Sequence, residues 1–151
     1  MVQKQMKKLL GIVVLGLLFC NIALAKNCTE KDEQYAREDS EIYGDKRTFT
    51  AEEAYNAGQI ILDIFKAKDL EKLVSMFDGE LKEGPPLSYF KNKTFDEAFQ
   101  QEFQDLIINS KPKCTLYDSN HGFQLGNTLI WFDKSKNNKW VIRRIHYEVK
   151  E

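Results

Sequence analysis

The chain has 151 residues, of which 42% are hydrophobic and 30% charged, a composition typical of one globular domain and not of a disordered or fibrous protein. Its formal net charge is -1, and lysines are the only charged residues among the first 25, so the rest of the chain is mildly acidic. We therefore expect no nucleic acid partner, because domains that bind nucleic acid carry clustered basic residues.

The first 25 residues have the three parts of a secretory signal peptide. They are a basic start at Lys4, Lys7 and Lys8, an apolar run over Leu9–Cys20, and a small-x-small cleavage site at Ala23–Ala25. We predict cleavage after Ala25 and a periplasmic or secreted protein without a stable membrane span. An uncleaved anchor is the weaker hypothesis, because the charge-free stretch is shorter than the roughly 20 residues that cross a bilayer.

Cleavage would leave two cysteines, Cys28 and Cys114, in an oxidising compartment, which predicts a disulfide between them. The bridge would tie the charge-rich segment 26–48 to a single domain over 49–151. Free or catalytic thiols are less favoured because the chain has no Cys-x-x-Cys spacing. Lipidation of Cys20 is a minority hypothesis, because Phe19 stands where a lipoprotein signal needs a small residue.

Two capping boxes predict where helices of the domain begin. Thr50–Glu53 opens a helix, and Thr94–Glu97 opens another that should end near Ser110. Between them, Asp69 can cap a further helix, which predicts a kink at Lys68-Asp69 and an end at Asp78-Gly79.

The stretch from Glu80 to Lys93 is less regular. Gly84-Pro85-Pro86 predicts an extended turn, followed by one short strand at Leu87–Phe90.

Beyond Cys114 the pattern changes to short runs of aromatic and β-branched residues, which predict three or four antiparallel strands. The runs are Leu116-Tyr117, Phe123–Leu125, Leu129–Phe132 and Trp140–Val149. Gly126-Asn127 suits a two-residue hairpin turn. Strict alternation in the last strand would place Trp140, Ile142, Arg144, His146 and Glu148 on one face and Val141, Arg143, Ile145, Tyr147 and Val149 on the other.

This order of elements predicts an α+β domain in which N-terminal helices pack on a curved antiparallel sheet. Ile64–Leu73 and Trp140–Ile145 resemble segments of the nuclear transport factor 2-like superfamily, and the element order also resembles the cystatin-like superfamily. Other segments are similar to uncharacterised small exported bacterial proteins: Phe77–Leu81, Gly84-Pro85, Cys114, Gly122–Asn127 and Ile130–Phe132. The resemblance covers about Thr50 to Tyr147 and implies a cone with an inner cavity or a cystatin-like roll.

Candidate catalytic residues are few. His146 is the best general base, with Arg144 two residues earlier to hold an anion. Enzymes of the superfamily that the chain resembles pair an acid or base in the cone with a tyrosine donor, for which Tyr117 and Tyr89 are the candidates. The simpler interpretation is that His146 is an ordinary strand residue and that His121 lies in a turn. No spacing typical of a metal site or a cofactor site occurs, so we predict neither.

Two classes of function follow from these observations. The first is an exported, non-enzymatic binding or accessory protein whose partner is an envelope protein or a small apolar ligand, with a homodimer through the sheet as a further hypothesis. Its binding surface would be the sheet, the loop from Gly84 to Lys93, or the acidic N-terminal segment. The alternative is a small-molecule enzyme or carrier that uses a cone-shaped cavity with His146 as its base. An interior filled by Trp131, Phe132, Phe99 and Phe103 would favour the first class.

Overall fold

The computed structural model describes residues 26–42, 49–115 and 122–147. The predicted leader, the predicted strand at Leu116-Tyr117 and the candidates Tyr117 and His121 lie outside these ranges. The helices are α2 (Glu30–Ile42), α3 (Ala51–Ala67), α4 (Leu70–Ser75), the 3-10 helix η1 (Leu87–Phe90), α5 (Phe95–Ala98) and α6 (Gln101–Ile108). The strands are β1 (Phe123–Leu125), β2 (Ile130–Lys134) and β3 (Trp140–Ile145), so the α+β class is confirmed.

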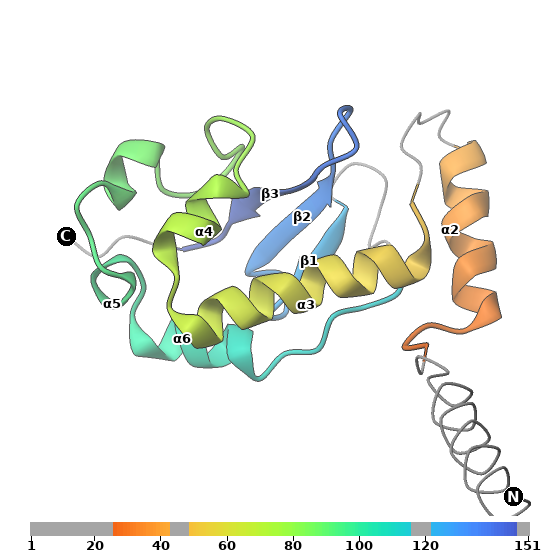
Figure 1. Ribbon diagram of the computed structural model, residues 1–151, viewed down its shortest axis with the longest axis horizontal. Coiled ribbons are helices and arrows are strands. Elements are labelled where there is room, and N and C mark those ends of the chain that lie inside the picture. The colour runs from red at the N-terminus through yellow and green to blue at the C-terminus, as the bar shows by residue number, and fades with distance from the viewer. Residues whose placement is uncertain (1–25, 43–48, 116–121, 148–151) are drawn as a thin grey trace, which may run out of the picture.

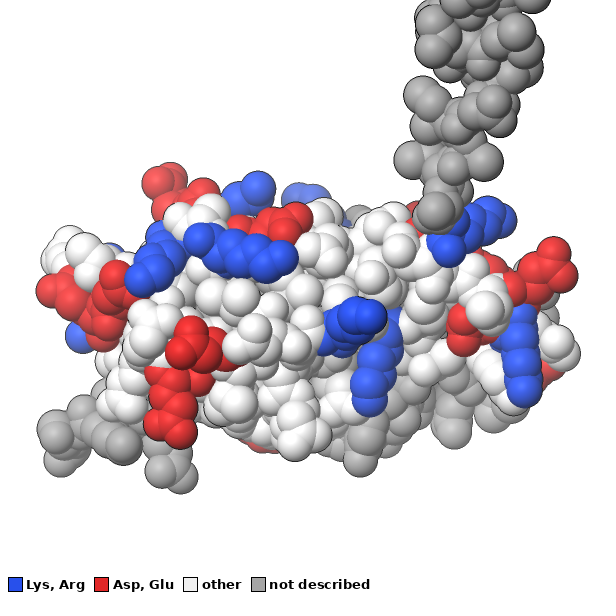
Figure 2. Space-filling view, turned by 90° about the horizontal axis from the view of Figure 1, so that it is seen from below, with Lys and Arg blue, Asp and Glu red and all other residues white. Residues whose placement is uncertain are grey.

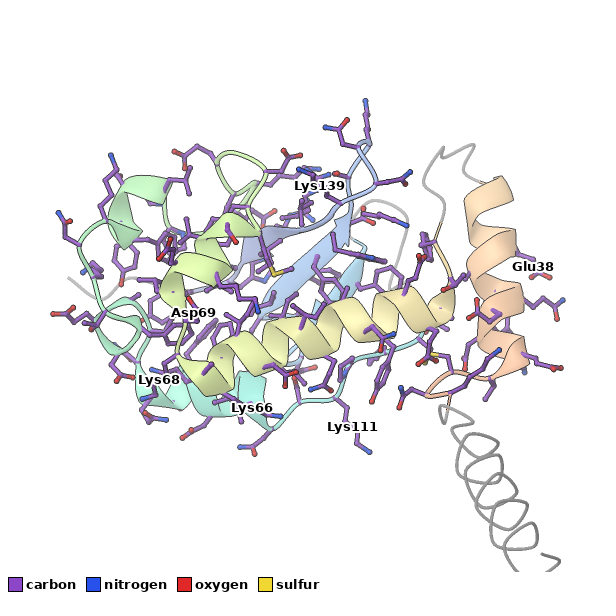
Figure 3. The ribbon with its side chains drawn as sticks, in the orientation of Figure 1. Glu38, Lys66, Lys68, Asp69, Lys111 and Lys139 are labelled. Atoms are coloured by element: carbon purple, nitrogen blue, oxygen red, sulfur yellow. A yellow bond between two sulfur atoms is a disulfide. The ribbon has the colours of Figure 1, made fainter. Side chains whose placement is uncertain are left out.

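The helix starts that the capping boxes predicted are confirmed. At α3 the backbone N–H of Glu53 donates to Thr50 Oγ1 at 3.1 Å, and the Thr50 N–H donates to the Glu53 carboxylate at 2.8 Å. Lys68 ends α3 in the left-handed conformation, and Asp69 caps α4 by accepting from Lys72 N at 2.9 Å. Figure 3 shows this kink at the labelled pair Lys68 and Asp69.

The helix opened by Thr94 is shorter than we predicted. Its capping box is present, but the chain is extended at Phe99 (φ -134°), which divides the region into α5 and α6. The buried side chain of Gln104 donates to the Phe99 carbonyl at 2.7 Å, so the break leaves this oxygen satisfied. Phe99 itself is fully buried in the core. The prediction of one continuous helix was wrong because packing of Phe99 outweighs local helix propensity.

The predicted strand at Leu87–Phe90 is also wrong, because this segment forms the 3-10 helix η1. Pro86 precedes it in an extended conformation and its carbonyl accepts from Tyr89 N at 2.9 Å. The turn directs Phe90 into the core, where it is 5% exposed. The apolar pattern therefore marked buried residues correctly but not their backbone conformation.

The described strands form one antiparallel sheet in the order β1-β2-β3. Leu125 pairs with Ile130, so four residues connect β1 and β2 where we predicted a two-residue turn. Gly126, Asn127 and Thr128 all have positive φ in this connection. Asn127 and Thr128 thus adopt positive φ angles, which favour glycine. The predicted two-residue turn would have required positive φ only at Gly126 and Asn127.

A β-bulge between β2 and β3 changes which residues of the last strand share a face. Trp131 pairs with Arg144, whereas the next residue of β2, Phe132, pairs with Ile142. Arg143 of β3 is therefore an extra residue that is opposite no residue of β2. Ile142 and Ile145 are both buried in the same core cluster. The strict alternation that we predicted is therefore wrong, because Arg143 is the extra residue in the ladder.

An irregular segment from Met76 to Glu83 lies along the outer edge of β3. The Met76 carbonyl accepts from Ile142 N at 2.9 Å, and the Glu83 carbonyl accepts from Ile145 N at 3.0 Å. Next to it Gly84 has φ +128°, and a Cβ there would lie 2.5 Å from the Ile145 carbonyl oxygen. This edge of the sheet is therefore covered by parallel bridges.

One hydrophobic core joins the helices to the sheet. In Figure 1, α3 crosses in front of the strands, and α4, α5 and α6 gather toward one end of it. Gly58 marks the closest approach, because a Cβ there would lie 2.8 Å from Pro112 Cβ and 3.2 Å from Phe132 Cζ. Among the largest buried side chains are Phe65, Phe99, Phe123, Phe132, Ile61, Ile64 and Leu73.

The N-terminal helix α2 stands at the opposite end of α3 (Figure 1). A disulfide joins Cys28 to Cys114, with an S–S distance of 2.00 Å. Among the side chains that the structure describes, a small apolar cluster lies beside it, built on the buried residues Cys28, Ala36 and Ala51. The described part of residues 26–42 is therefore attached to the domain through the disulfide and this small cluster.

Candidate functional site

Two of the catalytic candidates, His146 and Arg144, come together with a residue distant in sequence. His146 Nε2 lies 2.9 Å from Glu83 Oε2, and Arg144 Nε lies 3.0 Å from Glu83 Oε1. The pairing Gln124↔Trp131↔Arg144 continues this cluster across the three strands. A carboxylate thus bridges a histidine and an arginine at the edge of the sheet.

The electrostatics of this cluster favour a charged carboxylate. The hydrogen bond with His146, followed by the nearby charge of Arg144, holds the pKa of Glu83 below its ordinary value. The Arg144 side chain is only 12% exposed, whereas Glu83 is 56% and His146 40% exposed. Such a pair can orient an imidazole for proton transfer, but neither His146 nor Glu83 lines the groove between α4 and η1 or the two other best-formed surface hollows of the described residues.

Tyr89, the other tyrosine proposed as a donor, has a different partner. Its hydroxyl donates to the Ala98 carbonyl at 2.9 Å. Burial, together with the neighbouring Tyr147, raises the pKa of Tyr89. It therefore fastens η1 to α5 rather than serving His146.

The sequence analysis missed Glu83 as the partner of His146. The residues are 63 positions apart, and Glu83 lies in a stretch that the sequence marked only as irregular. The sequence feature that comes nearest to indicating this contact is the turn at Gly84-Pro85. Gly84 has a positive φ, and the residue before it, Glu83, forms a bridge with Arg144 of β3. No local pattern specifies that contact.

A second feature is an apolar groove of about 410 Å³ between α4 and η1. It is lined by Leu70, Glu71, Val74, Leu87, Phe90, Lys91 and Lys93. Phe90 packs against the core rings of Phe77 and Phe99, with centroids 5.6 and 5.8 Å apart. The groove therefore has a fixed apolar floor.

The charges around this groove are unequal. Lys91 and Lys93 lie on the η1 side and Glu71 on the α4 side. Lys93 Nζ lies 4.7 Å from the centroid of the Tyr89 ring, which is a cation-π contact. The rim of the groove is thus weakly positive and its floor apolar.

Charge elsewhere on the described surface is mixed. Figure 2 shows one face of the molecule, where positive and negative side chains occur in small groups with uncharged surface between them. Within residues 26–42, 49–115 and 122–147, no three His, Cys, Asp or Glu side chains are placed to hold a metal ion. In those same ranges, no helix has the length and apolarity needed to cross a membrane.

Comparisons with known proteins found no matching family model, no similar curated protein and no similar solved structure. The resemblances described from the sequence therefore remain hypotheses.

Proposed function

We propose that this chain is an exported, non-enzymatic binding protein that uses the groove between α4 and η1. The observation that carries the proposal is an open apolar groove on a surface segment, 84–93, with a positively charged rim. Removal of the leader after Ala25 and release into the periplasm or the medium are part of this proposal, and the Cys28–Cys114 disulfide is compatible with them.

The packing of the interior supports a binding surface over a catalytic cone. Phe132, Phe99 and Phe103 belong to the core cluster and are 0%, 0% and 7% exposed, respectively. Trp131 is also buried, at 5% exposed, but it lies outside that cluster, near His146. Phe99 and Phe103 stack with ring centroids 5.4 Å apart, which fills the space between helices and sheet. A ligand therefore finds apolar surface in the groove rather than in the centre of the domain.

Site-specific photo-crosslinking in exporting cells tests the proposal. A photoreactive amino acid replaces Leu87 in the groove or, as a matched control, Lys111, which Figure 3 places on the linker below α3. Adducts detected by mass spectrometry should form at position 87 and not at position 111. Equal labelling at the two positions, or none at either, would contradict the proposal. The same spectra should show a mature chain that begins at Lys26.

A second candidate function, a small-molecule enzyme or carrier, is favoured by one observation, the 2.9 Å contact between His146 and Glu83. It requires the curved, cone-like sheet and the relation to the nuclear transport factor 2-like superfamily that the resemblance implies. Ligand-induced NMR shifts of His146 without shifts at Leu87 would favour this alternative. Shifts at Leu87 alone would favour the groove.

A further inference from the structure

We infer that the groove between α4 and η1 binds a free single-chain carboxylic acid amphiphile, such as a fatty acid. The acyl chain would lie against Leu70, Val74 and Leu87, and the carboxylate would lie beside Lys91 and Lys93. This inference rests on the proposed function and specifies the ligand of the same groove.

The apolar part of the groove suits an alkyl chain. Leu70, Val74 and Leu87 are half-buried side chains, so each keeps apolar surface that a ligand can cover. Below them Phe90 is 5% exposed and its ring is held by Phe77 and Phe99. A volume of about 410 Å³ lies within the range of roughly 300–1,000 Å³ typical of small-molecule sites.

The backbone of the groove argues against an extended peptide as its ligand. The amides of Leu87, Tyr89 and Lys91 donate to Glu80 Oε2, the Pro86 carbonyl and the Ser88 carbonyl, respectively. A peptide added in extended form needs free backbone partners for its own N–H and C=O groups. An acyl chain has no such groups, so it can lie on this surface without leaving buried polar atoms unsatisfied.

The rim selects for a negative head group. Two lysines face one glutamate across the groove, and the described residues offer Lys91 Nζ no ion pair. Lys93 is partly engaged with the Tyr89 ring and with Glu97, whose pKa its charge helps to lower. A carboxylate near Lys91 would lie on the side of the groove away from Glu71. A cationic head group would meet two like charges there.

Titration of the isotopically labelled mature chain with dodecanoate, below the concentration at which it forms micelles, tests the inference. Backbone NMR shifts should change first at Leu70, Val74, Leu87 and Lys91, and should saturate. A nitroxide-labelled fatty acid should broaden the same resonances. Dodecanol should bind about threefold more weakly, and dodecyltrimethylammonium no better than dodecanol, because neither offers a carboxylate to the lysines.

Three variants localise the site. Val74→Asn should weaken dodecanoate binding about tenfold by placing an amide on the apolar surface. Lys91→Gln should weaken it about threefold and leave dodecanol binding unchanged. Lys111→Gln removes the same charge outside the groove and should change neither affinity. If Val74→Asn does not fold, the NMR shifts that dodecanoate causes in the wild-type chain still locate the site.

Absence of saturable shifts in the groove, or equal affinity for the cationic and anionic amphiphiles, would overturn the inference. Binding only to vesicles that contain anionic lipid, without binding of free dodecanoate, would also overturn it. If photo-crosslinking at position 87 captures a protein while dodecanoate does not bind, the inference fails and the proposed function stands. If both experiments fail, the groove is not a binding site.

Discussion

The two ends of α3 are held in different ways. At its C-terminal end, Phe65 is fully buried and its ring centroid lies 5.0 Å from that of Phe95 and 5.5 Å from that of Phe99. At its N-terminal end, the described side chains of residues 26–42 that are buried are two small ones, Cys28, which forms the disulfide with Cys114, and Ala36 of α2. Packing therefore stabilises the body of the domain, whereas cross-links hold the N-terminal segment.

Two carboxylates, one on each side of the disulfide-linked contact, add hydrogen bonds between the N-terminal segment and α3. Glu33 of α2 accepts from the backbone N–H groups of Ala51 and Glu52, at 2.8 and 3.3 Å, at the start of α3. In return, Glu52 accepts from the N–H groups of Asn27 and Cys28, and the hydrogen bond from the Asn27 side chain lowers the pKa of Glu52. Each segment thus supplies the acceptors that the other segment's backbone needs. In the part of this segment that the structure describes, carboxylates and a disulfide accompany a small apolar cluster.

The largest effect should come from breaking the disulfide. Cys28→Ser should lower the free energy of unfolding by about 4–5 kcal/mol, because the bridge closes a loop with a sequence separation of 86. Urea unfolding of the oxidised mature chain measures this loss, and hydrogen exchange should rise first in Glu30–Ile42. The double variant with Cys114→Ser is the control and should lose the same amount. A loss below about 1 kcal/mol would show that the carboxylates alone hold α2.

The matching change in the body is Phe65→Ala, which should cost about 3–5 kcal/mol by leaving a cavity among Phe95, Phe99 and Phe103. Its control is Tyr35→Ala on α2, an aromatic residue that is 46% exposed, for which we expect a change within about 0.5 kcal/mol. Urea unfolding measures both. Similar losses for the two variants would contradict the division between a packed body and a cross-linked segment.

The same division explains which features the sequence could predict. The starts of α3 and α5 were predicted because donor and acceptor of each capping box lie within four residues. The cysteine pair was predictable because residues 26–151 contain two cysteines, Cys28 and Cys114. These features depend on short-range geometry or on simple counting.

The features that escaped prediction depend on contacts between distant residues. The break at Phe99 requires the side chain of Gln104, and the bulge at Arg143 requires the register between β2 and β3. The partner of His146 is 63 residues away, in a segment that pairs with β3 through only isolated bridges. The groove likewise combines α4 with a 3-10 turn that the apolar pattern favoured as a strand. Periodicity alone specifies none of these contacts.

A smaller effect should follow from weakening the hydrogen bonds that Glu33 of α2 accepts from the backbone at the start of α3. Glu33→Gln keeps the size of the side chain but removes the charge that faces the N-terminus of α3, and should cost about 1 kcal/mol. Glu38→Gln on the same helix is the matched control, because Glu38 accepts only from Gln34 among the described residues and points away from α3 in Figure 3. Thermal unfolding at low salt compares them. Equal costs would contradict a specific role for Glu33.

The smallest effect should come from His146, and it separates a structural ion pair from an active site. His146 is 40% exposed, and Arg144 continues to face Glu83 when the imidazole is removed, so His146→Ala, which leaves no side-chain donor, should change the free energy of unfolding within about 0.5 kcal/mol. Its clearer consequence is on titration. The pKa of Glu83 is lowered first by its hydrogen bond with His146, so the variant should return that pKa toward the ordinary value of about 4.3.

The sign of the pH dependence follows from that shift. Because the pKa of Glu83 is lower in the folded chain than in the unfolded chain, its contribution to stability is present above about pH 4.3 and is lost as the pH falls through the lowered folded value. NMR titration of the Glu83 side-chain carboxyl carbon, in the wild type and in His146→Ala, measures both pKa values. Arg144→Gln should raise the pKa of Glu83 by a smaller amount, since its charge is the lesser favourable cause. A Glu83 titration that is unchanged in His146→Ala would show that the 2.9 Å contact does not persist in solution, and would remove the geometric support for His146 as a base.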